Sequence, residues 1–244
     1  MQELRDKVAI ITGGSRGVGR ATALALAREG ARIAVAARTA SEIEAVAREV
    51  SAAGGTAVAI RSDLAVEDDI KRLVQEAEAA LGPTDILVNN AGILKLAPIA
   101  QTSAELWDEM LSVNLRAVFL ACREVLPGMK ERRSGRIVNV GSMAGRRGYV
   151  EQGAYCATKH GLIGLSKVLA LETQAYGIRV HVIAPGGVLT GLSKELRESR
   201  GGVNESEWMT PEEVARAILY LCTQDGAALT DELVLRRYES EPWR

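Results

Sequence analysis

The stretch Thr12-Gly13-Gly14-Ser15-Arg16-Gly17-Val18-Gly19 joins a short apolar run at 8–11 to an amphipathic stretch at 17–29. Glycines at such a junction let the backbone turn tightly and approach a phosphate group closely. The helix that follows offers unpaired N–H groups and the positive end of its dipole. The loop therefore predicts a dinucleotide site, with a plain structural turn as the alternative, and its expected contacts are Gly13, Ser15, Arg16, Gly17, Val18 and Gly19.

The same alternation of short apolar runs and longer amphipathic stretches continues along the chain. Strands are expected at 8–11, 33–37, 56–60, 86–88, 137–140, 179–184 and 232–235. Helices are expected at 17–29, 40–53, 67–81, 104–126 and 154–176. This order predicts an α/β protein with a Rossmann-like, doubly wound parallel sheet flanked by helices. A single domain over 1–244 is expected, with a substrate flap at about 187–209, where no periodicity is evident.

Composition excludes several classes of protein. The chain has 244 residues, 47% of them hydrophobic, and a formal net charge of −1. This composition excludes disorder as the main state and general nucleic-acid binding. Three scattered cysteines, two histidines and short apolar runs leave no basis for a disulfide framework, a metal centre or membrane association. A cytoplasmic location is expected.

The residues that follow the second expected strand indicate which cofactor is bound. An NAD site usually places Asp or Glu there, but this chain has Ala36-Ala37-Arg38-Thr39. The guanidinium of Arg38 offers a planar fork to a 2′-phosphate, and Arg16 adds a second positive charge. NADP(H) is therefore favoured over NAD(H), the alternative being two solvated arginines. After the third strand, Asp63 is placed to accept from an adenine amino group or to cap a helix, with Leu64 beside it.

A second set of residues has the pattern of a catalytic site. Tyr155 and Lys159 are four residues apart and share one face of a helix. A nearby ammonium favours the phenolate, so we expect Lys159 to lower the pKa of Tyr155. With the loop at 12–19, the sequence resembles the short-chain dehydrogenase/reductase family from Lys7 to about Leu235. The other motifs behind the resemblance are Asn89-Asn90-Ala91-Gly92, Asn114, Ser142 thirteen residues before Tyr155, and Pro185-Gly186.

The resemblance implies a role for each matching residue. Tyr155 would give a proton to a carbonyl oxygen that Ser142 also holds, and Lys159 would bind the nicotinamide ribose and tune Tyr155. Asn114 would hold a water that links Lys159 to solvent. The cofactor would supply the hydride. The remaining cofactor contacts are implied beneath the adenine ribose and over the nicotinamide, and they are Asn90, Ala91, Gly92, Pro185, Gly186, Val188 and Thr190.

Within the family, the general pattern is most similar to 3-oxoacyl-[acyl-carrier-protein] reductases. The resemblance implies reduction of a ketone or 3-oxoacyl thioester, or the reverse reaction. The alternatives are a dehydrogenase that oxidises a diol, sugar or steroid alcohol, and a catalytically silent dinucleotide sensor. The resemblance implies a substrate pocket formed by the segments after Gly92, Ser142 and Gly186. Three basic residues in the first two segments either hold an anionic group of the substrate or point to water, and they are Lys95, Arg146 and Arg147. An acidic carrier protein is a possible partner of a second basic cluster, Lys130, Arg132 and Arg133.

The chain departs from these reductases at its end, where a charged tail with Trp243 replaces the usual terminal glycines. The segment between Gly186 and Pro211 is also shorter than usual. The resemblance implies a homo-oligomer, a dimer or tetramer, in which the helices at 104–126 and 154–176 pair across a twofold axis. An apolar stripe on these helices serves either that interface or the core, and its members are Val118, Leu120, Val125, Leu162, Leu165 and Leu169.

Overall fold

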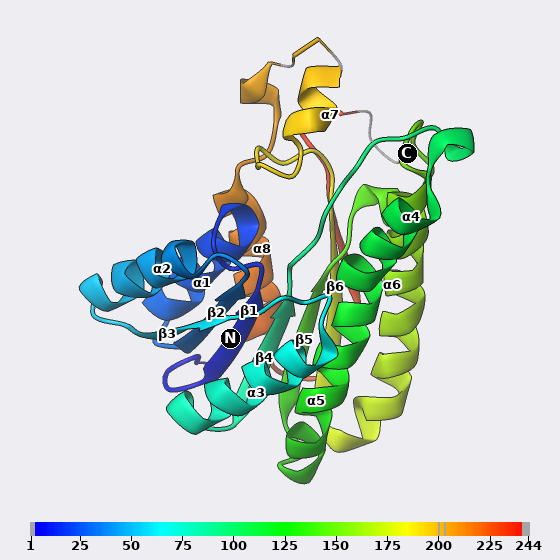
Figure 1. Ribbon diagram of the computed structural model, residues 1–244. Coiled ribbons are helices and arrows are strands. Elements are labelled where there is room, and N and C mark those ends of the chain that lie inside the picture. Colours follow the sequence, from blue (N-terminus) through cyan, green and yellow to red (C-terminus); the bar gives the residue numbers. More distant parts are fainter. Residues whose placement is uncertain (1–2, 200, 203, 241–244) are drawn as a thin grey trace.

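The computed structural model describes residues 3–199, 201–202 and 204–240. Its seven strands form one parallel sheet in the order β3-β2-β1-β4-β5-β6-β7 (Figure 1). Every predicted strand is confirmed, and the first six extend slightly beyond their apolar runs. The strands are β1 (Val8–Thr12), β2 (Arg32–Ala37), β3 (Thr56–Arg61), β4 (Thr84–Asn89), β5 (Gly135–Val140), β6 (Ile178–Pro185) and β7 (Glu232–Leu235).

Helices cover both faces of the sheet, which confirms the doubly wound Rossmann-like fold. The helices are α1 (Gly17–Arg28), α2 (Ala40–Ala52), α3 (Glu67–Leu81), α4 (Ala104–Leu111), α5 (Ala117–Glu131), α6 (Gly153–Thr173), α7 (Lys194–Ser199) and α8 (Pro211–Thr223). The core of one face packs under α1, α2 and α8, and that of the other face under α3, α5 and α6 (Figure 1). In β1, Val8 and Ile10 enter one core while Ala9 and Ile11 enter the other. Burial on both faces explains the nearly continuous apolar runs.

Two predictions about helices are corrected. The stretch 104–126 is not one α-helix: α4 ends at Leu111, a π-helical turn covers Ser112–Arg116, and α5 runs on to Glu131. Helix α8 was not expected, although Thr210 and Glu213 form a capping box and Pro211 stands at its first position. The expected flap at 187–209 contains the short helix α7.

The apolar stripe on the two long helices belongs to the core. Val118, Leu120, Val125, Leu162 and Leu169 are buried in the cluster beneath α5 and α6, and Leu165 packs against it. These positions face the sheet, so the stripe is not an intersubunit surface. Trp243 lies outside the described residues. No helix in the described ranges combines the length and the apolar character needed to cross a membrane.

Candidate active site

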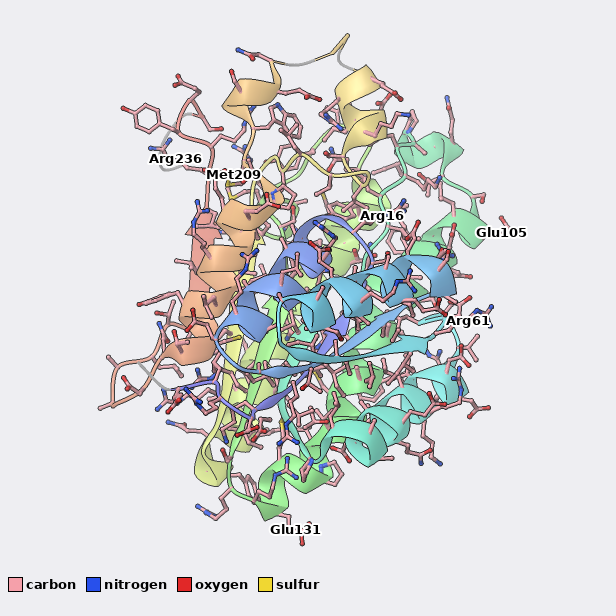
Figure 2. The ribbon with its side chains drawn as sticks, turned by 90° about the vertical axis from the view of Figure 1, so that its left-hand side faces the viewer. Arg16, Arg61, Glu105, Glu131, Met209 and Arg236 are labelled. Carbon is pink, nitrogen blue, oxygen red and sulfur yellow. The ribbon has the colours of Figure 1, made fainter. Side chains whose placement is uncertain are left out.

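A cavity of about 1230 Å³ lies at the carboxyl ends of the strands. The strand order reverses between β1 and β4, and a crevice forms at this edge of such sheets. Figure 2 places Arg16 and Arg236 toward this end of the molecule and Glu131 at the opposite end. Of the residues predicted for the site, all but Gly19 and Asn114 line the cavity.

The glycine loop forms one wall of the cavity. Gly13 has a φ of 63°, and a Cβ at this position would lie 2.8 Å from Cα of Ala91. Ser15, Arg16, Gly17 and Val18 also line the cavity. A Cβ at Gly19 would collide with the carbonyl oxygen of Gly13, so Gly19 lets α1 pack against the loop from behind. The backbone at Gly13 and Gly19 is therefore packed too closely to accept a side chain.

The segments after β2 and β3 form the adjoining wall. No hydrogen-bond acceptor among the described residues contacts the guanidinium of Arg38, which lines the cavity together with Arg16. Asp63 also lines the cavity, and its Oδ1 accepts from N of Ala65 at 3.0 Å. Val66 occupies the N-cap position of α3, so Asp63 forms a local turn before the helix. Leu64 adds an apolar surface to this wall.

The end of β4 is joined to the glycine loop by hydrogen bonds. Nδ2 of Asn90 donates to the carbonyl oxygens of Thr12 and Gly13, each at 3.0 Å. The main-chain N of Ala91 donates to Oγ1 of Thr12 at 3.2 Å. These bonds fix Asn90, Ala91 and Gly92 as one edge of the cavity.

Tyr155, Lys159 and Ser142 come together on the other side of the cavity. Tyr155 and Lys159 lie on consecutive turns of α6 and are 7% and 4% exposed. Nζ of Lys159 donates to the carbonyl oxygen of Val140 at 2.8 Å and lies 5.7 Å from the centroid of the Tyr155 ring. Ser142 follows β5 and forms a side-chain hydrogen bond with Tyr155.

The pKa expected for Tyr155 is wrong in its direction. Burial raises the pKa of the phenol to about 12, although the hydrogen bond with Ser142 acts against this rise. Burial also lowers the pKa of Lys159 to about 8. In both groups burial disfavours the charged form, and desolvation is the largest cause of each shift. At neutral pH, Tyr155 therefore holds its proton.

Asn114 lies behind the cavity wall, in the π-helical turn, and is fully buried. Its Oδ1 accepts from N of Ile93 at 2.8 Å, and its Nδ2 donates to O of Ile93 at 2.9 Å. Nδ2 also approaches Oγ1 of Thr158, on α6, at 3.3 Å. Asn114 therefore fixes the chain just past Gly92 and connects it to α6. The water link predicted through Asn114 stays a prediction.

The segment after β6 closes the cavity from above. Pro185, Gly186, Val188 and Thr190 all line it, as predicted. N of Gly186 donates to the carbonyl oxygen of Leu235 at 2.8 Å, which brings the end of β7 alongside. N of Leu189 donates to O of Met209, so both ends of the expected flap are held together.

The sequence of this chain is similar to those of known proteins over most of its length. Residues 7–201 match the family model described as short chain dehydrogenase. The chain belongs to the short-chain dehydrogenase family. Over 231 residues it is 36% identical to a 3-oxoacyl-[acyl-carrier-protein] reductase of Synechocystis sp. The alignment covers 93% of this chain and 94% of the relative. The chain is 40% identical over 218 residues to a reductase of the same description from Rattus norvegicus, with coverage of 88% and 91%.

Solved structures agree with this assignment. A metagenomic short-chain oxidoreductase in complex with NADP has a TM-score of 0.84 and 34% identity, over 96% of this chain and 99% of that one. Levodione reductase has a TM-score of 0.89 and 32% identity, over 96% of both chains. This short-chain dehydrogenase is accordingly an oxidoreductase with the fold that its sequence predicted.

The two groups of basic residues named from the sequence lie at opposite ends of this short-chain dehydrogenase. Lys130, Arg132 and Arg133 lie at the end of α5 or just after it, near Glu131 and at the opposite end of the sheet from the cavity (Figure 2). The guanidiniums of Arg132 and Arg133 donate to the carbonyl oxygens of Thr84 and Ala175. Within one chain, the cluster therefore does not border the cavity, and two of its members support the fold.

The three basic residues of the expected substrate segments do line the cavity. Arg146 is paired with Glu232 at 2.7 Å, and Nε of Arg147 donates to the hydroxyl of Tyr149 at 2.8 Å. Lys95 is exposed.

Sequence reasoning missed several residues of the cavity wall, among them Glu42, Gln152, Trp208, Arg236, Arg237 and Ser240. Glu42 lies in the first turn of α2, four residues after Arg38, a spacing that the sequence does show. The others reach the cavity through tertiary packing, for which no local signal exists.

Proposed function

We propose that this chain is an NADPH-dependent oxidoreductase that reduces a ketone or 3-oxoacyl thioester to a secondary alcohol. The observation that carries the proposal is the buried Tyr155, hydrogen-bonded with Ser142 and next to Lys159, in the same cavity as the glycine loop. This arrangement unites a proton donor and a dinucleotide cradle, as hydride transfer to a carbonyl requires.

The cavity fits NADP(H) through groups that the chain itself leaves available. The N-terminus of α1 and the close approach at Gly13 suit a pyrophosphate. The forks of Arg38 and Arg16 suit a 2′-phosphate, and Asp63 and Leu64 suit the adenine. The NADP complex of the metagenomic relative supports this assignment. When bound, NADPH supplies the hydride.

Each member of the tetrad has one task in the proposal. Tyr155 donates its proton to the carbonyl oxygen, and Ser142 donates a second hydrogen bond to the same oxygen. Lys159 holds the nicotinamide ribose, and Asn114 positions the segment after Gly92. Asn90, Ala91 and Gly92 pass beneath the adenine ribose, while Pro185, Gly186, Val188 and Thr190 surround the nicotinamide.

The protonation state of Tyr155 suits the role of general acid in reduction. A general acid must hold its proton before the reaction, and a phenol with a pKa of about 12 does so at neutral pH. Alcohol oxidation would instead begin from the phenolate, which burial disfavours here. The curated relatives are 3-oxoacyl-[acyl-carrier-protein] reductases, so a 3-oxoacyl thioester is the first carbonyl substrate to test.

The test is NADPH oxidation by the purified protein with a short 3-oxoacyl thioester, run beside NADH. We expect kcat/KM with NADPH to exceed that with NADH at least ten-fold, which corresponds to about 1.4 kcal/mol. Arg38→Asp should reverse this preference because it replaces the phosphate-binding fork with an acceptor for a ribose hydroxyl.

Tyr155→Phe is the matched control for chemistry, since it removes only the hydroxyl. It should abolish turnover and leave NADPH binding intact. Full activity of Tyr155→Phe, or an unchanged NADPH preference in Arg38→Asp, would contradict the corresponding assignment. Oxidation of alcohols without ketone reduction would favour a dehydrogenase instead.

A further inference from the structure

The chain past β7 returns to the cavity and forms part of its wall. Leu235 accepts from N of Gly186, and a Cβ at Gly186 would lie 3.9 Å from Cα of Arg236. Arg236, Arg237 and Ser240 line the cavity from this tail. The tail therefore stands next to the position proposed for the nicotinamide, where a substrate must also enter.

Arg237 is held in place by two contacts, and neither involves an acid. Its Nε donates to Oγ of Ser240 at 3.2 Å, and its Cζ lies 5.3 Å from the centroid of the Trp208 ring. Within the described part of the chain, no carboxylate pairs with Arg237. The Trp208 ring contacts the face of the guanidinium, and Ser240 occupies only Nε. The outer edge of the guanidinium is therefore available to a ligand.

Trp208 supplies a second donor at the same place. The residue is 6% exposed, lines the cavity, and packs so closely on Gly187 that a Cβ there would lie 2.9 Å from the indole. Its Nε1–H is buried and has no acceptor in the described structure. Buried donors of native proteins are almost always satisfied, so the acceptor of this N–H is not among the described residues.

Other charged residues on this side of the cavity are engaged or exposed. Arg146 is neutralised by Glu232, and Arg147 donates to Tyr149. Arg236 donates to three carbonyl oxygens of its own tail, at residues 237, 238 and 240. Lys95 and the acid Glu109 line the cavity in exposed positions. Arg237 is thus the guanidinium that is both fixed and unpaired.

We propose that Arg237 and Trp208 form an oxyanion subsite, so that the preferred substrate is a carbonyl compound with a carboxylate or another oxyanion group. A guanidinium fork binds two oxygens of such a group at once, and the unsatisfied indole N–H is a further donor in the residue on which Arg237 stacks. This inference rests on the proposed reductase function and adds a substrate class to it. The cation–π contact with Trp208 fixes the fork in advance, which lowers the entropic cost of binding.

The test uses keto carboxylates in which two to five methylene groups separate the ketone from the carboxylate. Their methyl esters and the corresponding keto phosphonates are assayed beside them. For at least one chain length, we expect kcat/KM of the acid to exceed that of the ester at least ten-fold. Arg237→Leu should reduce this ratio to below three-fold, and Arg237→Lys should give an intermediate value because it keeps the charge without the fork. Trp208→Phe keeps the ring, removes the N–H and should lower the ratio partly. The phosphonates show whether carboxylates or larger oxyanions are preferred.

Arg48→Leu is the control for net charge, because Arg48 lies on α2 with its side chain 71% exposed. It should leave the ratio unchanged. Equal kcat/KM for acids and esters in the wild-type protein, or a preference that survives in Arg237→Leu, would overturn the subsite. Calorimetry of the same acids with the NADPH-loaded protein separates the two proposals. Binding that depends on Arg237 without any turnover would support the subsite and overturn the reductase function, whereas an absence of binding would overturn the subsite.

Discussion

Burial controls the protonation of the two residues at the centre of the proposed site. Tyr155 and Lys159 are both shielded from water, and desolvation favours the neutral form of each. For Tyr155 this means a firmly held proton, which suits an acid. For Lys159 it means that keeping an ammonium in the fold at neutral pH costs stability, as is common where function conflicts with folding.

This cost predicts a dependence of stability on pH. Below pH 8, folded and unfolded chains both carry the Lys159 proton, and the penalty for burying the charge is fully present. Between pH 8 and the unfolded value of 10.5, the folded chain has lost the proton while the unfolded chain keeps it, so stability rises with pH. Relative to Lys159→Met, the wild-type protein should gain about 2–3 kcal/mol between pH 7 and 10. Urea unfolding of both proteins across this range measures the gain.

The variant also leaves the carbonyl oxygen of Val140 without its Lys159 partner, so the absolute difference at one pH is not diagnostic. The slope of the difference is diagnostic. Two curves that stay parallel from pH 7 to 10 would show that burial does not lower the pKa of Lys159.

At the residue scale, the sequence predicts chemistry that follows from spacing and from the end of a strand. The four-residue separation of Tyr155 and Lys159 and the position of Arg38 after β2 are of this kind. The direction of the Tyr155 pKa was not predictable, because it depends on burial, which is a property of packing. Arg237 reaches the cavity through the return of the chain beside Gly186, and no local pattern encodes that contact.

At the element scale, the π-helical turn Ser112–Arg116 is the feature that places Asn114. Such turns are rare and frequently occur at functional sites. Apolar periodicity alone continues from α4 into α5, so the sequence predicted one helix across this turn. In this turn the Asn114 amide bonds both main-chain groups of Ile93.

Asn114→Ala should therefore loosen the segment after β4. It leaves the part-buried N–H and C=O of Ile93 without their partner, and we expect a loss of about 1–3 kcal/mol in the free energy of unfolding. Hydrogen exchange gives the specific readout: the Ile93 amide should lose more protection than amides of the central strands.

Thr210→Ala is a suitable control because it removes the N-cap of α8 and costs about 1 kcal/mol elsewhere in the fold. It should leave the relative protection of Ile93 unchanged. Equal protection of Ile93 in both variants would contradict the positioning role of Asn114.

Helix α8, by contrast, could have been predicted from the sequence, because Thr210, Pro211 and Glu213 carry the signal of a helix start.

At the scale of the whole molecule, the two ends of the sheet have different roles. The carboxyl ends of the strands carry the cavity, whereas the arginines at the other end, such as Arg132 and Arg133, donate to main-chain carbonyl oxygens. The parallel sheet and its two-sided core were predictable because short buried runs alternate with amphipathic stretches. The assembly of several chains was not, since the stripe first considered for it faces the core.

The outer faces of α5 and α6 still present large apolar residues to solvent. Phe119, Val168 and Leu171 are 46%, 52% and 76% exposed, on two helices that lie side by side (Figure 1). We expect them to meet the same face of a second copy across a twofold axis, because an isologous contact buries the same patch on both subunits. The double variant Phe119→Glu/Leu171→Glu places like charges in that contact and should convert the protein from a dimer or tetramer into a monomer. Light scattering after size exclusion measures the mass, and Val150→Glu, at a position 89% exposed outside these helices, is the matched control. A wild-type monomer, or an assembly that survives the double variant, would place the subunit contact elsewhere or exclude it.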